Sequence, residues 1–490
     1  MRKLGAPGRT ATVLLAASIG VLATGTAQAQ TGGSGSDGYW ATPPPYVASY
    51  LPSDNGGHNS FDYQPKNACV TRDLGQKDVV LREKPWGQQY LQIDEAQQLV
   101  RAKTGSAGGG VRVAVIDTGV TQHPYLKRLE GGGDYVVAGD DGLNDCDGHG
   151  TEVAGIIAAS TPPDQIGFTG VAPDATIVSI RQSSQNYQRP DSGGDTSGQQ
   201  TSGRQQNDAN GAGTTQSLAQ AIVRAVNLHV DVINMSVDNC RPADGTITDG
   251  ERAVQAAVRY AVDNDIVVVA AAGNTSETCP QNDQADPNKP RSIVTPPWFS
   301  DDVLSVAAID ETGGVAPFSV NGPWVSVAAP GTNIISLDPS KGSSQLANQT
   351  IENDKATPIQ GTSFAAPYVT GVVALVSAQY PNLSARQIMN RIRVTAQHPG
   401  AQGGRDNFIG HGVVNPVAAV TAIVPSEEGV AAAGAEQLPS GMPDGGPKDW
   451  TPMIVALAGT GGGLVVLLVV MFVMRTLRHT RGQRAGAHPK

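Results

Sequence analysis

The feature that most constrains the fold is a series of short, almost uninterrupted runs of valine, isoleucine and alanine. Four such runs stand out, at residues 111–116, 176–180, 230–235 and 266–272. Runs that are apolar throughout are typical of strands covered on both faces, as in a parallel sheet. Helical patterns separate them, at residues 152–160, 215–227 and 250–264. This alternation predicts one large α/β sandwich domain.

Both ends of the chain carry targeting segments. Residues 1–29 have a basic start, an apolar stretch and the exit Ala27-Gln28-Ala29, the three parts of a secretory signal peptide. An uncleaved N-terminal anchor is the alternative. Residues 453–474 carry no charge and are long enough to cross about 30 Å of hydrocarbon as a helix. The basic tail at 475–490 then predicts a cytoplasmic C-terminus, with everything between signal and span outside the membrane.

Composition divides this exported region into three parts. Residues 30–83 form an arm rich in Gly, Ser, Pro and Asn, 84–424 hold the strand and helix patterns, and 425–452 are typical of a flexible tether. Two polar insertions interrupt the middle part, at 182–213 and 338–357; for the first, an unstructured loop competes with a lid or partner contact. The formal net charge is −10 and both ends are basic, so the exported region is strongly acidic and nucleic-acid binding is not expected.

The run GTSFAAPYVTGVVAL at 361–375 places one serine where a nucleophile could be made. A tight turn precedes Ser363 and an apolar helix follows it, so Ser363 is expected at a helix N-terminus. Free N–H groups and the helix dipole favour an oxyanion there. Taken alone, Ser363 is better explained as a helix cap, because a serine hydroxyl is a poor nucleophile without a base.

Three further polar residues stand in glycine-rich turns beside apolar elements. Asp117 ends the run VAVID, His149 lies between two glycines in DGHGTEVAG, and Asn274 follows VVVAAAG. Because functional groups collect at the carboxyl ends of parallel strands, we expect these residues to meet Ser363. Each alone has a structural interpretation, as a cap, a surface histidine or a turn residue.

As a set, the four residues meet the needs of acyl transfer. His149 would take the proton of Ser363 and return it to the leaving amine, while Asp117 holds the imidazole in the useful tautomer. The Asn274 amide and the Ser363 backbone N–H would form the oxyanion hole. This chemistry needs no cofactor or metal. No CxxC spacing or tight Asp/Asn cluster indicates a metal site, and the acidic run at 140–147 is interpreted as a solvated loop.

The order Asp, His, Asn, Ser and the motifs around these residues resemble the subtilisin-like serine proteases. The resemblance covers most of 86–424 and includes WGQQYLQIDEA, VDVINMS, PFSVNGPWVSVAAPG, GTSFAAPYVTG and YPNLSARQI. It implies a three-layer α/β sandwich with a mainly parallel seven-stranded sheet, and endopeptidase activity on a protein or peptide substrate.

The domain organisation resembles one group of these proteases, the mycosins of type VII secretion systems. The resemblance rests on the signal peptide, the arm, four exported cysteines, the tether and a single C-terminal anchor. It implies that the arm wraps the catalytic domain and that the protein associates with the secretion complex in the membrane. Substrate processing and stabilisation of that complex are both implied roles.

Two departures from the subtilisin pattern concern packing and specificity. Phe364 and Tyr368 replace the Met and His that usually follow the serine, which should alter packing but not the triad. Ser236, Val237 and Asp238 occupy the strand that pairs with substrate, where the family usually has Ser-Leu-Gly. The added carboxylate of Asp238 suggests a narrowed specificity, toward basic or small side chains.

Four cysteines lie in the exported region, where an oxidising compartment favours disulfides. Cys240 and Cys279 follow the strands that end at 235 and 272, and they can meet if those strands are neighbours. Cys69 then pairs with Cys146 by elimination, which would pin the arm beside His149.

Two other functions compete with this interpretation. Asp117-Thr118-Gly119 resembles the active-site loop of aspartic proteases, but the only second copy, Asp191-Ser192-Gly193, lacks a preceding apolar strand. The alternative from another class is a structural component of a secretion complex that keeps a protease fold as a scaffold. The intact set of four residues argues against a dead enzyme, but it does not exclude a second, structural role.

Overall fold

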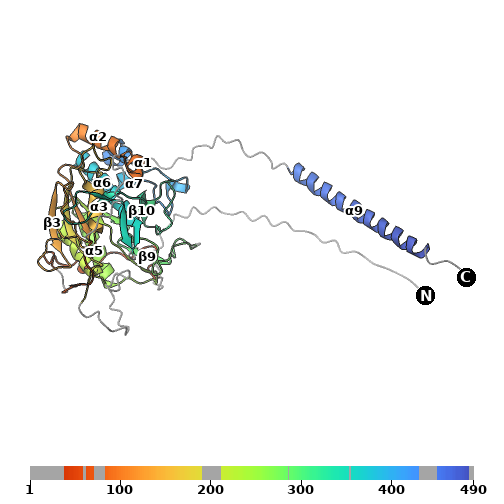
Figure 1. Cartoon of the computed structure of the whole chain (residues 1–490), viewed down its shortest axis with the longest axis horizontal. Coiled ribbons are helices and arrows are strands. Elements are labelled where there is room, and N and C mark those ends of the chain that lie inside the picture. The colour runs from red at the N-terminus through yellow and green to blue at the C-terminus, as the bar shows by residue number, and fades with distance from the viewer. Residues whose placement is uncertain are drawn as a thin grey trace, which may run out of the picture. The chain divides into compact units, whose positions relative to one another are not determined.

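The structure is a computed structural model that describes residues 38–58, 62–70, 83–189, 211–284, 286–352, 355–429 and 450–484. The predicted signal peptide lies outside the described residues, as do most of the insertion at 182–213 and most of the tether at 425–452. The chain forms two compact units, Met1–Glu427 and Glu428–Lys490 (Figure 1).

A seven-stranded sheet forms the centre of the first unit. Its order from edge to edge is β11, β10, β8, β6, β2, β4, β3, and every neighbouring pair is parallel. The strands are β2 (Arg112–Asp117), β3 (Leu129–Asp134), β4 (Thr176–Arg181), β6 (Val232–Met235), β8 (Val267–Ala271), β10 (Leu304–Ile309) and β11 (Val325–Pro330). The four strands predicted from the sequence are β2, β4, β6 and β8, which are adjacent in the sheet. Every residue of β6 and β8 is buried, as expected for runs without polar alternation.

Helices cover the sheet in two layers, which confirms the predicted three-layer sandwich. In one layer α3 (His149–Ala158) and α6 (Thr362–Gln379) pack on each other, with α2 (Ile93–Thr104), α7 (Ala385–Val394) and α8 (Pro416–Thr421) around α6. In the other, α4 (Thr215–Asn227) packs against α5 (Asp249–Asp263). Figure 1 shows α5 and α2 on opposite sides of this unit.

The predicted helices are α3, α4 and α5. Capping boxes explain why α4 and α5 begin where the sequence indicates. The hydroxyls of Thr214 and Thr248 each accept a bond from the N–H three residues on, and the side chain of that third residue accepts a bond from the threonine N–H. α3 begins earlier than expected, at His149, because Gly148 adopts a left-handed conformation (φ 93°) that lets the chain turn into the helix.

Short elements complete the unit around the sheet. They are η1 (Ala48–Tyr50), β1 (Gln64–Pro65), α1 (Trp86–Tyr90), β5 (Tyr187–Gln188), β7 (Asn239–Pro242), β9 (Ser292–Thr295), β12 (Ser336–Leu337), β13 (Leu346–Ala347), β14 (Gln349–Glu352), β15 (Lys355–Pro358), η3 (Gln402–Gly404) and η4 (Pro425–Glu428). The predicted insertion at 338–357 therefore contains β13, which pairs antiparallel with β12 just before the insertion, and most of a second antiparallel pair, β14 with β15. The unit also includes Glu427, whose carboxylate pairs with the buried Arg391 on α7.

The described parts of the arm lie against the first unit at several points. β1 pairs with β5, Tyr39 forms a β-bridge with Gly245, and the Pro44 carbonyl accepts a hydrogen bond of 2.7 Å from Gln255 on α5. The arm is thus in contact with β5, with the segment around Gly245 and with α5.

The second unit contains α9 (Thr451–Arg484). Its segment Thr451–Leu477 is long and apolar enough to cross a membrane, and it includes the predicted span at 453–474.

Candidate active site

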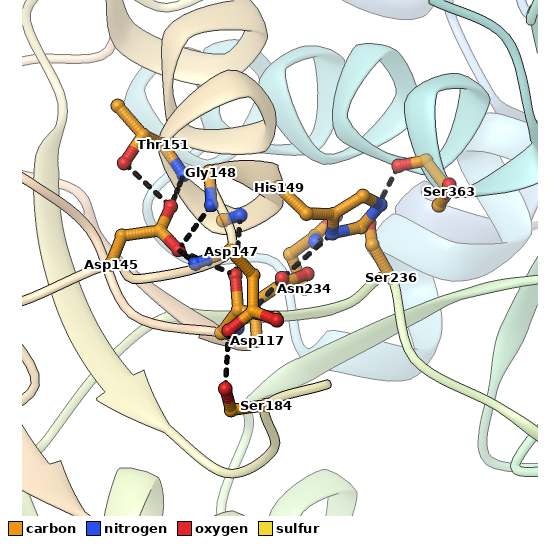
Figure 2. Close-up of polar contacts among 12 residues, drawn as sticks. Asp117, Asp145, Asp147, Gly148, His149, Thr151, Ser184, Asn234, Ser236 and Ser363 are labelled. Carbon is orange, nitrogen blue, oxygen red and sulfur yellow. Dashed lines mark hydrogen bonds and ion pairs between the residues drawn. The ribbon is translucent and has the colours of Figure 1, made fainter. Parts of the chain in front are cut away.

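The residues singled out from the sequence converge where three adjacent strands end. Asp117 is the last residue of β2, Ser236 follows β6 directly, and Asn274 follows β8 after Ala272 and Gly273. Ser363 lies in the first turn of α6, whose N-terminus faces these strand ends. Figure 2 shows the His149 imidazole between Asp117 and Ser363.

Asp117 holds the imidazole of His149 in one orientation. The His149 Nδ1 lies 2.7 Å from Asp117 Oδ1, and the N–H of Thr118 donates to the same oxygen at 2.7 Å. The Asp117 side chain is fully buried, whereas 28% of the His149 side chain is exposed. A carboxylate acceptor at Nδ1 favours the tautomer that leaves Nε2 free to accept a proton.

The carboxylates around His149 favour its charged form. Burial of the imidazole lowers its pKa, but Asp117, with smaller contributions from Glu152 and Asp145, outweighs burial and raises the pKa of His149 to about 9. These groups therefore stabilise the imidazolium that a general base becomes when it takes a proton.

Ser363 is nearly buried. The next residue of α6, Phe364, lies beside the His149 imidazole. The ring of Phe364, which replaces the Met usual in subtilisins, stands 5.1 Å from the imidazole between ring centroids. Within the described part of the chain, no hydrogen bond joins the Ser363 hydroxyl to His149. Hydrogen bonds between a nucleophile and its base are often long in a structure without substrate and tighten when substrate binds.

Pro367 and Ser236 together fix the start of α6. Proline has no N–H, so Pro367 cannot bond to the carbonyl of Ser363 one turn earlier in the helix. That carbonyl instead accepts a hydrogen bond of 2.7 Å from the Ser236 hydroxyl. Asn234 donates to the Ser236 hydroxyl at 3.0 Å and accepts a bond of 2.8 Å from Thr370. The sequence identified Ser236 as a substrate-strand residue; the structure shows that its side chain anchors the helix that carries Ser363.

Asn274 is oriented by a residue that the sequence analysis missed. Its Oδ1 accepts bonds from the N–H and the hydroxyl of Thr362, at 3.0 and 3.1 Å. This leaves the Asn274 amide nitrogen for another acceptor. A Cβ at Gly361, whose φ is 149°, would lie 2.9 Å from Ser363 Oγ and 3.6 Å from Asn274 Nδ2. The hydroxyl and the amide thus line the same small space, which only glycine leaves open.

Asp145 organises the segment that carries His149, and the interpretation of 140–147 as a solvated loop is wrong at this residue. Asp145 is 5% exposed. One of its oxygens accepts bonds from Gly148 N–H at 2.7 Å and the Thr118 hydroxyl at 2.9 Å, and the other from the N–H and hydroxyl of Thr151 at 2.8 and 2.7 Å. Asp145 therefore caps the N-terminus of α3, which explains why an acidic residue is buried here.

Asp238 lies at the edge of this site and is half-buried. A Cβ added to Gly273, the residue before Asn274, would lie 3.5 Å from Asp238 Oδ2 and 3.0 Å from Val294 on β9. The Asp238 carboxylate and the Val294 side chain therefore approach the same face of Gly273. Val237, like Asp238, is half-buried.

Two disulfides have the pairing expected from the strand order. Cys240 is bonded to Cys279, and Cys69 to Cys146. The strands before Cys240 and Cys279 are β6 and β8, which are neighbours. Cys146 stands within the segment that leads to His149, so the arm is covalently attached next to the site. Within the described ranges, no group of three or more His, Cys, Asp or Glu side chains is placed to hold a metal ion.

Comparison with known proteins identifies relatives that match most of the chain. Residues 108–412 match the Subtilase family, Peptidase S8. Mycosin-1 of Mycolicibacterium smegmatis is 40% identical over 397 residues, which cover 79% of this chain and 83% of that protein. Mycosin-3 of Mycobacterium tuberculosis is 42% identical over 393 residues, covering 77% and 81%.

Solved structures agree with the sequence relatives. The crystal structure of MycP1 from Mycobacterium smegmatis has a TM-score of 0.69 at 38% identity, covering 81% of this chain and 99% of that one. A chain in an intact ESX-5 inner membrane complex has a TM-score of 0.70 at 39% identity, covering 89% and 100%. The chain therefore belongs to the subtilase family of serine endopeptidases, and within that family to the mycosins.

Proposed function

We propose that Asp117, His149 and Ser363 are the catalytic triad of this endopeptidase and that Asn274 completes its oxyanion hole. The observation that carries the proposal is the 2.7 Å bond between His149 Nδ1 and the buried Asp117, with the Ser363 helix next to the same imidazole. Asp117 fixes the tautomer, so the Nε2 of His149 is the atom that accepts the proton of the Ser363 hydroxyl.

The reaction follows from these positions. The Ser363 oxygen attacks the scissile carbonyl while its proton passes to His149, and the negative charge that develops on the carbonyl oxygen is met by the Asn274 amide and the Ser363 N–H. Collapse of this intermediate breaks the C–N bond, and His149 gives its proton to the leaving amine. Water then attacks the acyl-enzyme and gives a proton to His149. Collapse of this second intermediate breaks the bond to the Ser363 oxygen, and His149 returns the proton to it.

The loop after β6 is the substrate-binding segment in this proposal. Ser236, Val237 and Asp238 run beside the oxyanion donor, and the Asp238 carboxylate near Gly273 favours substrates with basic or small side chains there. The Ser236 hydroxyl is already used to hold Ser363, so its contribution to substrate binding is through its backbone.

We further propose that the enzyme works on the outer side of the cell membrane as part of a type VII secretion complex. The helix Thr451–Leu477 supplies an anchor, and the basic residues after it favour a cytoplasmic tail. A similar chain forms part of an ESX-5 inner membrane complex, and another solved relative is described as a component of the ESX-1 secretion system. A structural role in such a complex, beside proteolysis or with little of it, is the second candidate that these relatives favour.

Labelling with a fluorophosphonate tests the nucleophile directly. In this reaction the serine oxygen bonds to phosphorus, fluoride leaves, and the base takes the serine proton. We expect the purified full chain to be labelled and Ser363→Ala to be unlabelled, while the control Ser300→Ala, altered far from the site, is labelled as the natural protein is. Equal labelling of Ser363→Ala would overturn the assignment.

A secretion assay in cells separates the enzymatic role from the structural one. If secretion fails on deletion of the whole gene but persists with Ser363→Ala, the structural role is established beside the enzymatic one. If both changes abolish secretion equally, proteolysis itself is required.

A further inference from the structure

Glu152 is a buried carboxyl group one helical turn beyond His149. Both residues are in the first turns of α3, and positions three apart in a helix lie on the same face. Glu152 is 2% exposed. In the described part of the chain no lysine or arginine forms an ion pair with it. An acidic side chain is rarely buried to this extent without a cationic partner.

The hairpin of β12 and β13 covers this turn of α3. The Ser336 hydroxyl donates to the Glu152 carbonyl at 2.5 Å, and a Cβ on Gly155 would lie only 2.7 Å from Leu337. Asp338, at the start of the turn between the two strands, is itself 2% exposed. The hairpin therefore packs on the turn of α3 that carries Glu152.

Charged groups from several segments around the start of α3 act on Glu152. His149 on α3 is the cationic group, and the acidic groups are Asp117 at the end of β2, Asp145 before α3 and Asp338 after β12. Asp338 also acts on His123, whose ring nitrogens bond to the Gln345 carbonyl and the Tyr125 N–H. Burial raises the pKa of Glu152 well above its usual range, and His149 is the group that opposes this shift. The ionised form of Glu152 is thus favoured when His149 is charged.

We propose that Glu152 is a positioning residue of the catalytic machinery, whose buried carboxylate stabilises the imidazolium form of His149 in addition to Asp117. The proposal rests on the proposed function, because it concerns the same base. Its consequence is an enzyme that needs a higher pH before His149 is free to accept a proton. In exchange, the imidazolium that forms during attack is more stable.

The pH dependence of fluorophosphonate labelling tests this on the full chain without knowledge of the substrate. We expect Glu152→Gln, which keeps the shape and removes the charge, to move the acidic limb of the labelling rate to lower pH by about one unit. Below the limb the fraction of neutral His149 is about tenfold larger in the variant, which more than offsets its weaker base, so it reacts about two- to threefold faster than the natural protein; on the alkaline plateau it reacts several-fold more slowly. The two profiles cross, which a mere loss of packing would not produce.

Two further variants make the result specific. Glu152→Asp retains a carboxylate and should keep the limb close to that of the natural protein, while Glu95→Gln, at an exposed position of α2, should change nothing. An unshifted limb in Glu152→Gln overturns this proposal alone, provided that the natural protein is labelled at Ser363. Absence of labelling in the natural protein would instead overturn the proposed function.

Discussion

Replacement of Asp145 by alanine should be the most damaging change near the active site that leaves the triad itself intact. The Asp145 carboxylate is buried and accepts bonds from two backbone N–H groups of α3 and its cap, Gly148 and Thr151, and from the hydroxyls of Thr118 and Thr151. Alanine accepts none of these.

The magnitude follows from the donors left without an acceptor. Loss of a helix N-cap costs about 1–2 kcal/mol. The two buried hydroxyls each add about 1 kcal/mol, because an unpaired buried donor loses its hydration without compensation. Burial raises the pKa of Asp145, which shows that its charge is itself costly here and that the bonds do not add in full. We therefore expect the free energy of unfolding to fall by less than this sum, by about 2–3 kcal/mol.

Denaturant unfolding of the full chain in detergent measures this. Fluorescence of the buried Trp298 and Trp324 reports on the peptidase unit, and Ser363→Ala as the background prevents self-cleavage. Asp141→Asn is the matched control, because Asp141 is exposed and caps only the N–H of Leu143; it should cost less than about 1 kcal/mol. A loss below 1 kcal/mol for Asp145→Ala would refute the argument that this carboxylate organises the start of α3.

Two other changes follow from the site. Asn274→Ala should lower kcat by about 10²–10³ with little change in KM, the size of effect known for the oxyanion asparagine of subtilisin, and an unchanged kcat in steady-state peptide cleavage would remove Asn274 from the mechanism. Burial raises the pKa of Asp147 to about 6, against about 3.9 in an unfolded chain, so the folded state keeps a proton between pH 4 and 6 that the unfolded state loses. The contribution of Asp147 to stability therefore falls as pH rises through this window. From pH 4 to 7 the unfolding free energy of Asp147→Asn should gain about 1–2 kcal/mol relative to the natural protein, and a difference that does not vary with pH would contradict the shift.

The central strands could be predicted because a strand buried on both faces consists almost entirely of apolar residues. β8 contains only valine and alanine, and both β8 and the equally buried β6 stand in the middle of the sheet. The edge strand β3 has the opposite character, LEGGGD, and no apolar run indicates it. Its glycines have a tertiary cause: a Cβ on Gly132 would lie 2.7 Å from Ile180 of β4, and one on Gly133 would lie 2.8 Å from Gly57 of the arm. Such crowding depends on partners far along the chain, so local sequence cannot reveal it.

Some residues of the site can likewise be recognised from the local sequence, whereas others depend on contacts with distant segments. Asp117, Asn274 and Ser363 follow recognisable strand or turn patterns with glycine beside them, which is why the sequence indicates them. Thr362 and Asp145 have no such pattern, because what they do is set by their acceptors and donors in other segments. An acidic residue in a glycine-containing loop is exposed by default, and only the hydrogen bonds at the start of α3 reverse this for Asp145.

The motif DGHGTEVAG identifies His149 as the base but does not predict which segments surround it. Cys146 joins this segment to the arm through Cys69, and Asp147 accepts bonds from the N–H groups of Gln185 and Asn186 in the loop beside β5. A Cβ on Gly148 would lie 2.7 Å from Pro339 of the hairpin that also packs on the turn of α3 carrying Glu152. Segments from three distant parts of the chain thus fix the residues on either side of the imidazole. A short motif can specify the chemistry of the base because that chemistry resides in one side chain, whereas its orientation and charge depend on contacts that exist only once all three segments have folded.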